Sequence, residues 1–155
     1  MKALSLWQPW AAAIALGLKA WETRSYATSY RGVLAIHAAK RDPLTVMTPL
    51  LLGEYLCRIR ATAPSDLIPQ VEDARGAIVA VVRFTECRRT KEVRDQLSEG
   101  ERFWGDYADD RYAWRLEGAV PLLRPVPIRG QQMIWTLSAT EAQAVEAAMP
   151  RGVAA

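Results

Sequence analysis

The chain is poor in cysteine and histidine, and this shortage excludes several classes of site. Its 155 residues include only two cysteines, Cys57 and Cys87, and one histidine, His37. Two distant cysteines are too few for a disulfide framework or a zinc site, so we expect reduced, partly buried thiols in a cytoplasmic protein. A single histidine excludes a nuclease mechanism that uses two histidines. The sequence therefore predicts no metal site.

Long hydrophobic runs and common cofactor motifs are also missing. The longest apolar stretch, residues 9–18, is half of the roughly 20 residues that a membrane span needs. Lys2 is followed by Leu4 and Trp7 rather than by a long apolar segment with a cleavage site, so we expect no secretory signal. There is no glycine-rich phosphate loop and no Gly-x-Ser-x-Gly motif. We therefore expect no membrane span and no cofactor.

What remains is an ordinary globular composition with an uneven charge. Hydrophobic residues make up 50% of the chain and charged residues 24%, which suits one packed domain covering residues 1–155. Residues 1–60 contain eight basic and three acidic residues, whereas residues 61–155 contain twelve and fourteen. This asymmetry indicates either an anionic partner for the first part or a solvated basic face without a partner.

The hydrophobic pattern predicts six short strands with helices between them. Strands are expected at residues 3–6, 19–25, 33–39, 77–85, 112–117 and 133–137, and helices at 9–17, 42–60, 90–98 and 138–149. Segments 61–76 and 101–111 are expected to be loops, and the proline-rich segment 120–127 an edge or linker. In 112–117, alternation places Tyr112, Trp114 and Leu116 inward and Ala113 outward. The spacing favours an α+β fold built on a strongly bent sheet or small β-barrel.

Residues 19–24 form the densest polar cluster beside apolar elements. Glu22 is a candidate general base, or a hydrogen-bond acceptor for the edge of a nucleobase. Lys19 is a candidate for stabilising an oxyanion or a phosphate, and Arg24 is a candidate for binding a phosphate. Alternatively, Glu22 and Arg24 lie on one strand face and simply pair with each other. Lys19 and Glu22 point to opposite faces of a straight strand, so they share a site only if the chain bends near Lys19.

Further candidates for nucleic-acid binding combine aromatic and polar side chains. One hypothesis is that these side chains stack on bases, contact phosphates or read base edges. The alternative is that they are core and turn residues without such a role. The candidates near the amino terminus are Trp7, Gln8 and Trp10. The candidates in later turns and strands are Tyr30, Arg31, His37, Arg129 and Gln131.

An ordered series of motifs in this chain resembles the ASCH domain family, named for activating signal cointegrator homology. The series covers roughly residues 3–137: Leu4-Ser-Leu-Trp-Gln-Pro-Trp-Ala11, Gly17-Leu-Lys19, Glu22-Thr-Arg24, Tyr30-Arg-Gly32, Ile36-His-Ala38, Gly105-Asp-Tyr107, Arg111-Tyr-Ala-Trp114 and Pro125-Val-Pro-Ile-Arg-Gly130, ending at Trp135. The resemblance implies a PUA-like fold, a small β-barrel with flanking helices, and a cleft that binds or acts on RNA. Some family members resemble amidohydrolases of N4-acetylcytidine, and others are ribonucleases.

The resemblance carries over residue by residue with two departures. Deacetylase-like members use a Lys, a Thr three residues later and a Glu further on. Lys19 matches the Lys, but Glu22 occupies the Thr position. The second Glu has no clear counterpart, and the candidates for it are Glu54, Glu99 and Glu101. Arg24 matches the strand Arg, and the Glu-x-Arg form is typical of the cointegrator-like branch, for which the resemblance implies RNA or nucleotide binding.

Three functions follow as hypotheses. The first is an RNA-binding module whose basic cleft recognises single-stranded RNA or a modified nucleotide. The second is a metal-independent hydrolase, a single-strand ribonuclease or an N4-acetylcytidine amidohydrolase, with Lys19 and Glu22 as catalytic residues. The third is a structural or regulatory interaction domain in which the Glu22–Arg24 pair only stabilises the fold.

Overall fold

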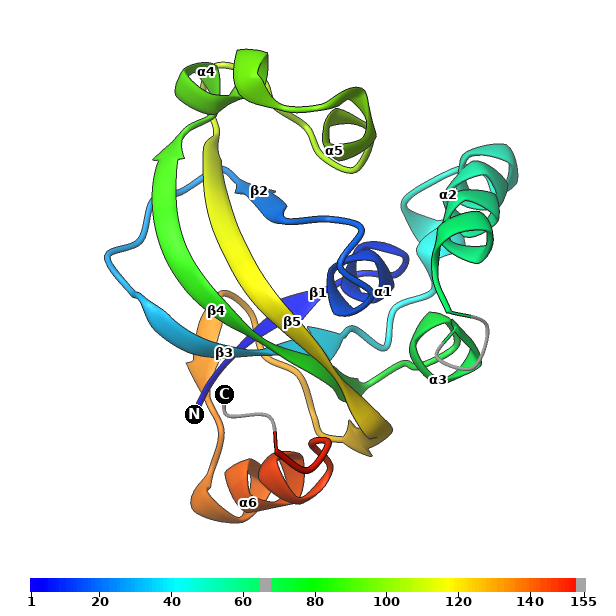
Figure 1. Cartoon of the computed structure of the whole chain (residues 1–155), viewed down its shortest axis with the longest axis vertical. Helices are drawn as coiled ribbons and strands as arrows, with labels where there is room; N and C mark the ends of the chain where they lie inside the picture. The colour runs from blue at the N-terminus through cyan, green and yellow to red at the C-terminus, as the bar shows by residue number, and fades with distance from the viewer. Residues whose placement is uncertain (65–67, 153–155) are drawn as a thin grey trace.

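One strongly curled sheet of six strands organises the molecule (Figure 1). The computed structural model describes residues 1–64 and 68–152. Only β1 and β3 pair in parallel, and every other neighbouring pair is antiparallel. The sheet order is β2-β5-β4-β3-β1-β6. The strands are β1 (Lys2–Leu6), β2 (Trp21–Arg24), β3 (Gly32–Ala38), β4 (Ala77–Arg89), β5 (Tyr112–Pro127) and β6 (Ile134–Thr136).

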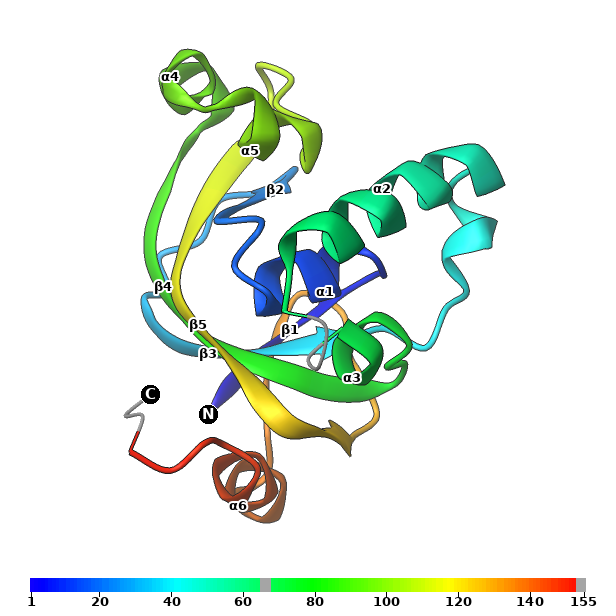
Figure 2. The ribbon, with the colours of Figure 1, turned by 45° about the vertical axis from the view of Figure 1, so that its right-hand side comes forward.

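The six strands and the curl confirm the expected α+β, barrel-like fold. The sheet is a half-barrel rather than a closed barrel, because its two edge strands, β2 and β6, do not pair with each other. The long, curved β4 and β5 follow most of the curl (Figures 1 and 2). The helices are α1 (Trp10–Ala15), α2 (Pro49–Thr62), α3 (Ile68–Glu72), α4 (Thr90–Val93), α5 (Glu99–Phe103) and α6 (Ala139–Ala147), with short 3-10 turns at Pro43–Thr45 and Arg94–Gln96.

Helix α1 lies inside the curl and fills the concave side of the sheet (Figures 1 and 2). Its sequence is Trp-Ala-Ala-Ala-Ile-Ala, and all residues after Trp10 are buried. Small side chains on every side let the helix contact β3, β4, β5 and α3 closely. Gly17 follows with a φ of +72°, the left-handed conformation expected of the residue that ends this helix.

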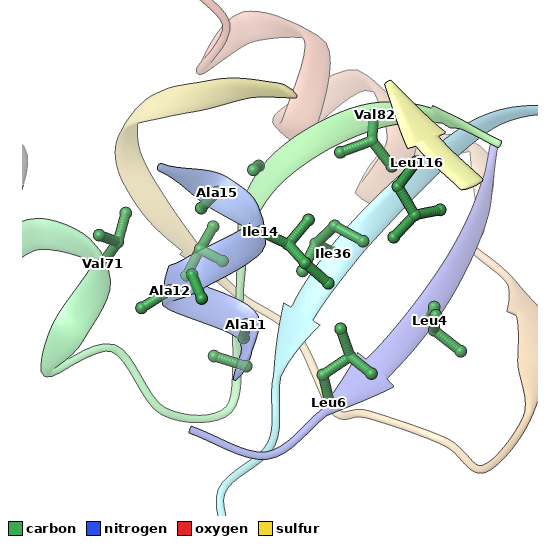
Figure 3. Close-up of a cluster of buried hydrophobic side chains, with 14 of the residues drawn as sticks. Leu4, Leu6, Ala11, Ala12, Ile14, Ala15, Ile36, Val71, Val82 and Leu116 are labelled. Carbon is green, nitrogen blue, oxygen red and sulfur yellow. The ribbon is translucent and has the colours of Figure 1, made fainter. Parts of the chain in front are cut away.

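Two hydrophobic layers pack on the two faces of the sheet. The concave layer joins α1 to residues such as Leu4, Leu6 and Ile36 (Figure 3). On the convex side, Val145 of α6 packs against a second cluster that includes Trp135. The expected Ser138 capping box begins α6. The strands near the cleft described below are therefore held from both sides.

Two expectations about the segment from residue 112 to 127 need correction. Residues 112–127 form one continuous strand rather than a strand and a linker. Prolines are tolerated beyond Leu116 because β2 pairs only with Tyr112–Arg115, which leaves one edge of the later part of β5 without a β2 partner. Ala113 is fully buried against Trp21 and Tyr107 rather than outward-facing.

The segments expected to be loops contain short helices. Helix α5 begins at Glu99, capped by the Ser98 hydroxyl, and α3 lies within the expected connection 61–76, of which residues 65–67 fall outside the described chain. Residues 42–60 break at Thr48-Pro49 into a 3-10 turn and α2, because Thr48 caps the new helix. Cys57 is exposed and Cys87 is half-buried, so only the second thiol matches the expectation. No described helix has the length and apolarity of a membrane span.

Candidate functional site

A cleft opens where four distant parts of the chain meet. It has a volume of about 430 Å³, within the usual range for small-molecule sites. We call it the first cleft. The end of β1 and the start of α1 form one side, β2 the floor, α2 another side, and the segment between α5 and β5 the last. Its lining residues are Ser5, Leu6, Trp7, Trp10, Glu22, Thr23, Arg24, Tyr55, Trp104, Gly105, Asp106 and Arg111.

An ion triad lies along the floor of this cleft. Glu22 Oε2 is 3.5 Å from Lys19 Nζ, and Glu22 Oε1 is 3.7 Å from Arg24 Nη1. The exposed fraction of the side chain rises from 1% in Lys19 to 9% in Glu22 and 24% in Arg24. The triad therefore runs from the interior to the solvent, and Arg24 is the member that a ligand reaches first.

Lys19 lies behind Glu22 rather than in the first cleft. The chain bends before β2 begins at Trp21, so Lys19 and Glu22 come together despite the odd spacing. Lys19 Nζ donates to the main-chain carbonyl of Trp21, and Lys19 also lines a separate pocket beside Gly17. Burial lowers the pKa of Lys19, although the carboxylates of Glu22 and Glu101 oppose this shift.

The bend is held by Glu101, one of the three candidates that the sequence offered for the second Glu of the deacetylase-like members. Its carboxylate accepts hydrogen bonds from the main-chain N–H groups of Ala20 and Trp21, each at 2.9 Å, and from the Tyr107 hydroxyl at 3.3 Å. Burial raises the pKa of Tyr107, so its phenol stays protonated and donates. Glu101 thus satisfies the main-chain N–H groups at the start of β2, as a neighbouring strand would, and fixes the chain at the bend.

The opposite side of the cleft is tied to β2 by Arg111 and Asp106, which sequence analysis missed. Arg111 Nη2 donates to the carbonyl of Thr23 at 3.1 Å, and its Nε lies 3.4 Å from Asp106 Oδ2. The Asp106 N–H donates to Thr23 Oγ1 at 3.3 Å. The available signal was the pair of motifs beginning at Gly105 and Arg111, since both carry polar residues beside aromatic ones.

Trp7 and Trp10 differ in how they meet the cleft. Trp7 is 40% exposed, and the guanidinium of Arg41 lies 5.1 Å from its ring centre. Trp10 is half-buried and packs edge-on against Tyr55, with ring centres 5.8 Å apart. Trp7 is therefore the more accessible of the two rings, with the Arg41 guanidinium over it, whereas Trp10 forms a fixed side of the cleft.

Gln8 has a structural position. It is 2% exposed, its Nε2 donates to the carbonyls of Val71 and Ala74, and its Oε1 accepts from the Ala12 N–H. These bonds fasten the start of α1 to the chain around α3. Since its amide donates and accepts within the fold, Gln8 does not line the first cleft.

A second chamber continues from the first cleft. It has a volume of about 530 Å³, and it shares Ser5, Trp7 and Arg24 with the first cleft. The two cavities therefore adjoin at Trp7, and we refer to them together as the groove. The remaining lining residues of the second chamber are Tyr26, His37, Ala39, Lys40, Gly130, Gln131, Gln132 and Met133.

His37 forms the inner wall of the second chamber. Its Nε2 lies 3.0 Å from the carbonyl of Ile128, and its ring meets Trp135 edge-on at 6.0 Å between centres. Burial lowers the pKa of His37, although the hydrogen bond to Ile128 opposes the shift. The imidazole is therefore neutral near pH 7, with Nε2–H donating and Nδ1 left as an acceptor.

The other candidates lie away from the groove. The Tyr30 hydroxyl donates to the carbonyl of Val33, and Arg31 donates to main-chain carbonyls while its guanidinium covers the Phe84 ring at 4.8 Å. Arg129 is exposed and lines neither cavity. The structure thus brings together Trp7, Trp10, Glu22, Arg24, His37 and Gln131, with Lys19 behind them. Within residues 1–64 and 68–152, no three His, Cys, Asp or Glu side chains are grouped so that they could hold a metal ion.

Known sequences resemble this chain over most of its length. Activating signal cointegrator 1 of Homo sapiens and that of Mus musculus are each 25% identical over 134 residues, which is 86% of this chain and 22% of the relative. The chain thus spans about a fifth of the length of these curated relatives.

Solved structures support the same assignment at the level of the fold. ASCH from Zymomonas mobilis and one of its point variants each superpose with a TM-score of 0.56 and 15% identity. Both alignments cover 96% of this chain, with 95% of the first structure and 98% of the variant. The family model of the ASCH domain matches residues 4–127. The chain therefore belongs to the ASCH domain family.

Proposed function

We propose that this protein binds single-stranded RNA, with one base held in the first cleft. The observation that carries the proposal is that Trp7, which is 40% exposed, lines one cleft together with the ion-paired side chains of Glu22 and Arg24. An open aromatic ring stacks on any base, an exposed guanidinium binds phosphate, and a carboxylate accepts hydrogen bonds from a base edge. Single-stranded rather than duplex RNA leaves a base free to enter such a cleft.

A labelled RNA tests this proposal. Fluorescence anisotropy of a 5′-fluorescein single-stranded hexanucleotide gives the dissociation constant at each salt concentration. Two phosphate contacts give a slope of about −1.4 in log affinity against log salt, or about sevenfold weaker binding between 50 and 200 mM KCl. An affinity that does not change with salt contradicts the proposal.

Two substitutions that each remove one positive charge test whether RNA binds in the groove. We expect Arg24→Gln to weaken binding about tenfold, because one charge-assisted phosphate contact is lost. Arg129→Gln removes the same charge outside the groove and should change the affinity less than twofold. Equal effects of the two substitutions would mean that binding is not centred on the cleft.

Hydrolysis of RNA or of N4-acetylcytidine is the second candidate, and the Lys19–Glu22 ion pair motivates it. However, the Lys19 side chain is only 1% exposed and Lys19 is not among the residues that line the first cleft, so its ammonium group does not contact a substrate oxygen there. We therefore expect a 5′-labelled RNA carrying one N4-acetylcytidine to remain unchanged by gel and mass spectrometry. A product that disappears with Lys19→Ala or Glu22→Gln would instead make the protein a hydrolase.

A further inference from the structure

Three of the residues that line the second chamber each have a buried polar atom without a hydrogen-bond partner. The atoms are Arg24 Nε, Tyr26 Oη and His37 Nδ1. Buried polar atoms in folded proteins nearly always have a partner, because an unpaired one loses its hydration without compensation. Three such atoms in residues that line one cavity, in the part of the chain that the structure describes, point to a polar ligand.

The hydrogen-bonding character of these atoms is mixed. Arg24 Nε donates, the Tyr26 hydroxyl can donate or accept, and His37 Nδ1, which lies against the main chain of Gly130, is an acceptor because Nε2 donates to the carbonyl of Ile128. The amide side chain of Gln131 adds a donor and an acceptor at the exposed side of the chamber. A nucleobase carries both donors and acceptors on its edges, so it matches this set better than a simple anion does.

The charge around the second chamber differs from that around the first cleft. Glu22 and Asp106 line the first cleft, whereas none of the described residues that line the second chamber is acidic, and Lys40 and Arg24 are both basic. A phosphate therefore meets less repulsion on the side of the second chamber. Arg24 lines both cavities, which places its guanidinium where a phosphate would join two nucleotides.

We infer that the groove takes two adjacent nucleotides, one base in each cavity, with Trp7 between them and the linking phosphate at Arg24. This inference rests on the proposed RNA binding and adds that the minimal ligand is a dinucleotide. Trp7 lines both cavities, so its ring contacts both bases. The second chamber has the larger volume of the two, and it accommodates a nucleotide of either base size.

Titration with short nucleotides tests this inference. The probes are AMP, CMP, GMP and UMP, and the dinucleotides ApA, CpC, GpG and UpU with a 5′-phosphate, with binding followed by protein NMR. We expect the best dinucleotide to bind at least tenfold more tightly than its mononucleotide. A third nucleotide should add less than threefold.

Variants of the second chamber separate the two bases. Lys40→Gln removes its cation, and Tyr26→Phe removes the unpartnered hydroxyl while keeping the ring that packs on Trp114. Each should weaken dinucleotide binding at least fivefold and change mononucleotide binding less than twofold. The matched control Arg129→Gln should change neither more than twofold.

The outcomes distinguish this inference from the proposed function. Mononucleotides that bind as tightly as dinucleotides would overturn the two-nucleotide groove while leaving RNA binding in place. Equal losses of mononucleotide and dinucleotide binding in Lys40→Gln and Tyr26→Phe would also overturn it. If neither mononucleotides, dinucleotides nor the hexanucleotide bind, both the inference and the proposed function are wrong.

Discussion

A Cβ atom added to Gly130 would lie 2.3 Å from Cε1 and 2.7 Å from Nδ1 of His37. The loop before β6 therefore rests directly on the imidazole ring, and only glycine allows this close approach. The same contact holds Gln131 beside the second chamber. The shape of the second chamber thus depends on the absence of a side chain at Gly130.

Gly130→Ala should destabilise the fold, because the added methyl group cannot fit against His37. Overpacking of this kind costs about 1–3 kcal/mol. Gly53→Ala is the matched control: Gly53 lies within α2 and an added Cβ meets nothing within 4 Å, so that change should stabilise by about 0.5–1 kcal/mol. Urea unfolding of the two variants measures the decrease in the free energy of unfolding expected for Gly130→Ala and the increase expected for Gly53→Ala. A Gly130→Ala protein as stable as the wild type would contradict the packing described for His37.

Protonation of His37 should lower the stability of the fold in mild acid. Burial lowers the pKa of His37 below 6.5, so below pH 6.5 the unfolded chain binds a proton that the folded chain does not. Stability is therefore full above pH 6.5 and falls toward the lowered pKa by up to about 1.4 kcal/mol per pH unit. Since the chain has one histidine, the difference in unfolding free energy between wild type and His37→Gln isolates this loss. A pH-independent difference would mean that the imidazole titrates normally.

Tyr107→Phe should remove an alkaline loss of stability. The pKa of Tyr107 is raised from 10.0, so above pH 10 the unfolded phenol ionises while the folded one remains protonated. Its contribution is complete below pH 10 and falls above it by up to about 1.4 kcal/mol per pH unit. The variant should also lose about 1 kcal/mol near pH 7, because the hydrogen bond to Glu101 is gone. Unfolding curves at pH 7 and above pH 10 measure both effects, and an unchanged alkaline slope would count against the protonated phenol.

Trp7→Ala should weaken RNA binding without much change in stability. Loss of one stacking surface costs about 1–3 kcal/mol, or roughly 5- to 150-fold in affinity. The side chain is 40% exposed, so its removal disturbs little packing. Leu123→Ala is the control, since Leu123 is 61% exposed and lines neither cavity. Fluorescence anisotropy of both variants measures RNA affinity, and thermal unfolding measures their stability. An unchanged affinity in Trp7→Ala would mean that Trp7 is not part of the binding site.

The sequence predicts elements whose signals are local. The β-branched run beginning at Ala77, the Ser138 capping box and Gly17 as the end of α1 all depend on neighbouring residues, and the structure has them in place. The continuous β5 was not predictable, because whether prolines are tolerated depends on which strand lies alongside. Ala113 was misplaced for a similar reason, since the residues that bury it come from β2 and the segment after α5.

The candidate site was partly predictable. Residues 19–24 stand out because a polar cluster next to apolar elements is unusual, and Glu22 and Arg24 indeed line the first cleft. The roles of Glu101 and Arg111 were hidden, because both contact the main chain of β2 from 80 or more positions away. Tyr30 and Arg31 fit a binding motif by composition, yet the fold uses them to cover Phe84.

Photocrosslinking tests most directly whether RNA occupies the groove. A single-stranded RNA containing 4-thiouridine at each position in turn is irradiated with the protein, and the crosslinked residues are identified by mass spectrometry. The account predicts crosslinks at aromatic residues of the groove, such as Trp7, Trp10 and Tyr26, and weaker crosslinking in Arg24→Gln. Crosslinks confined to Tyr30 or Tyr112, which lie outside both cavities, would contradict it.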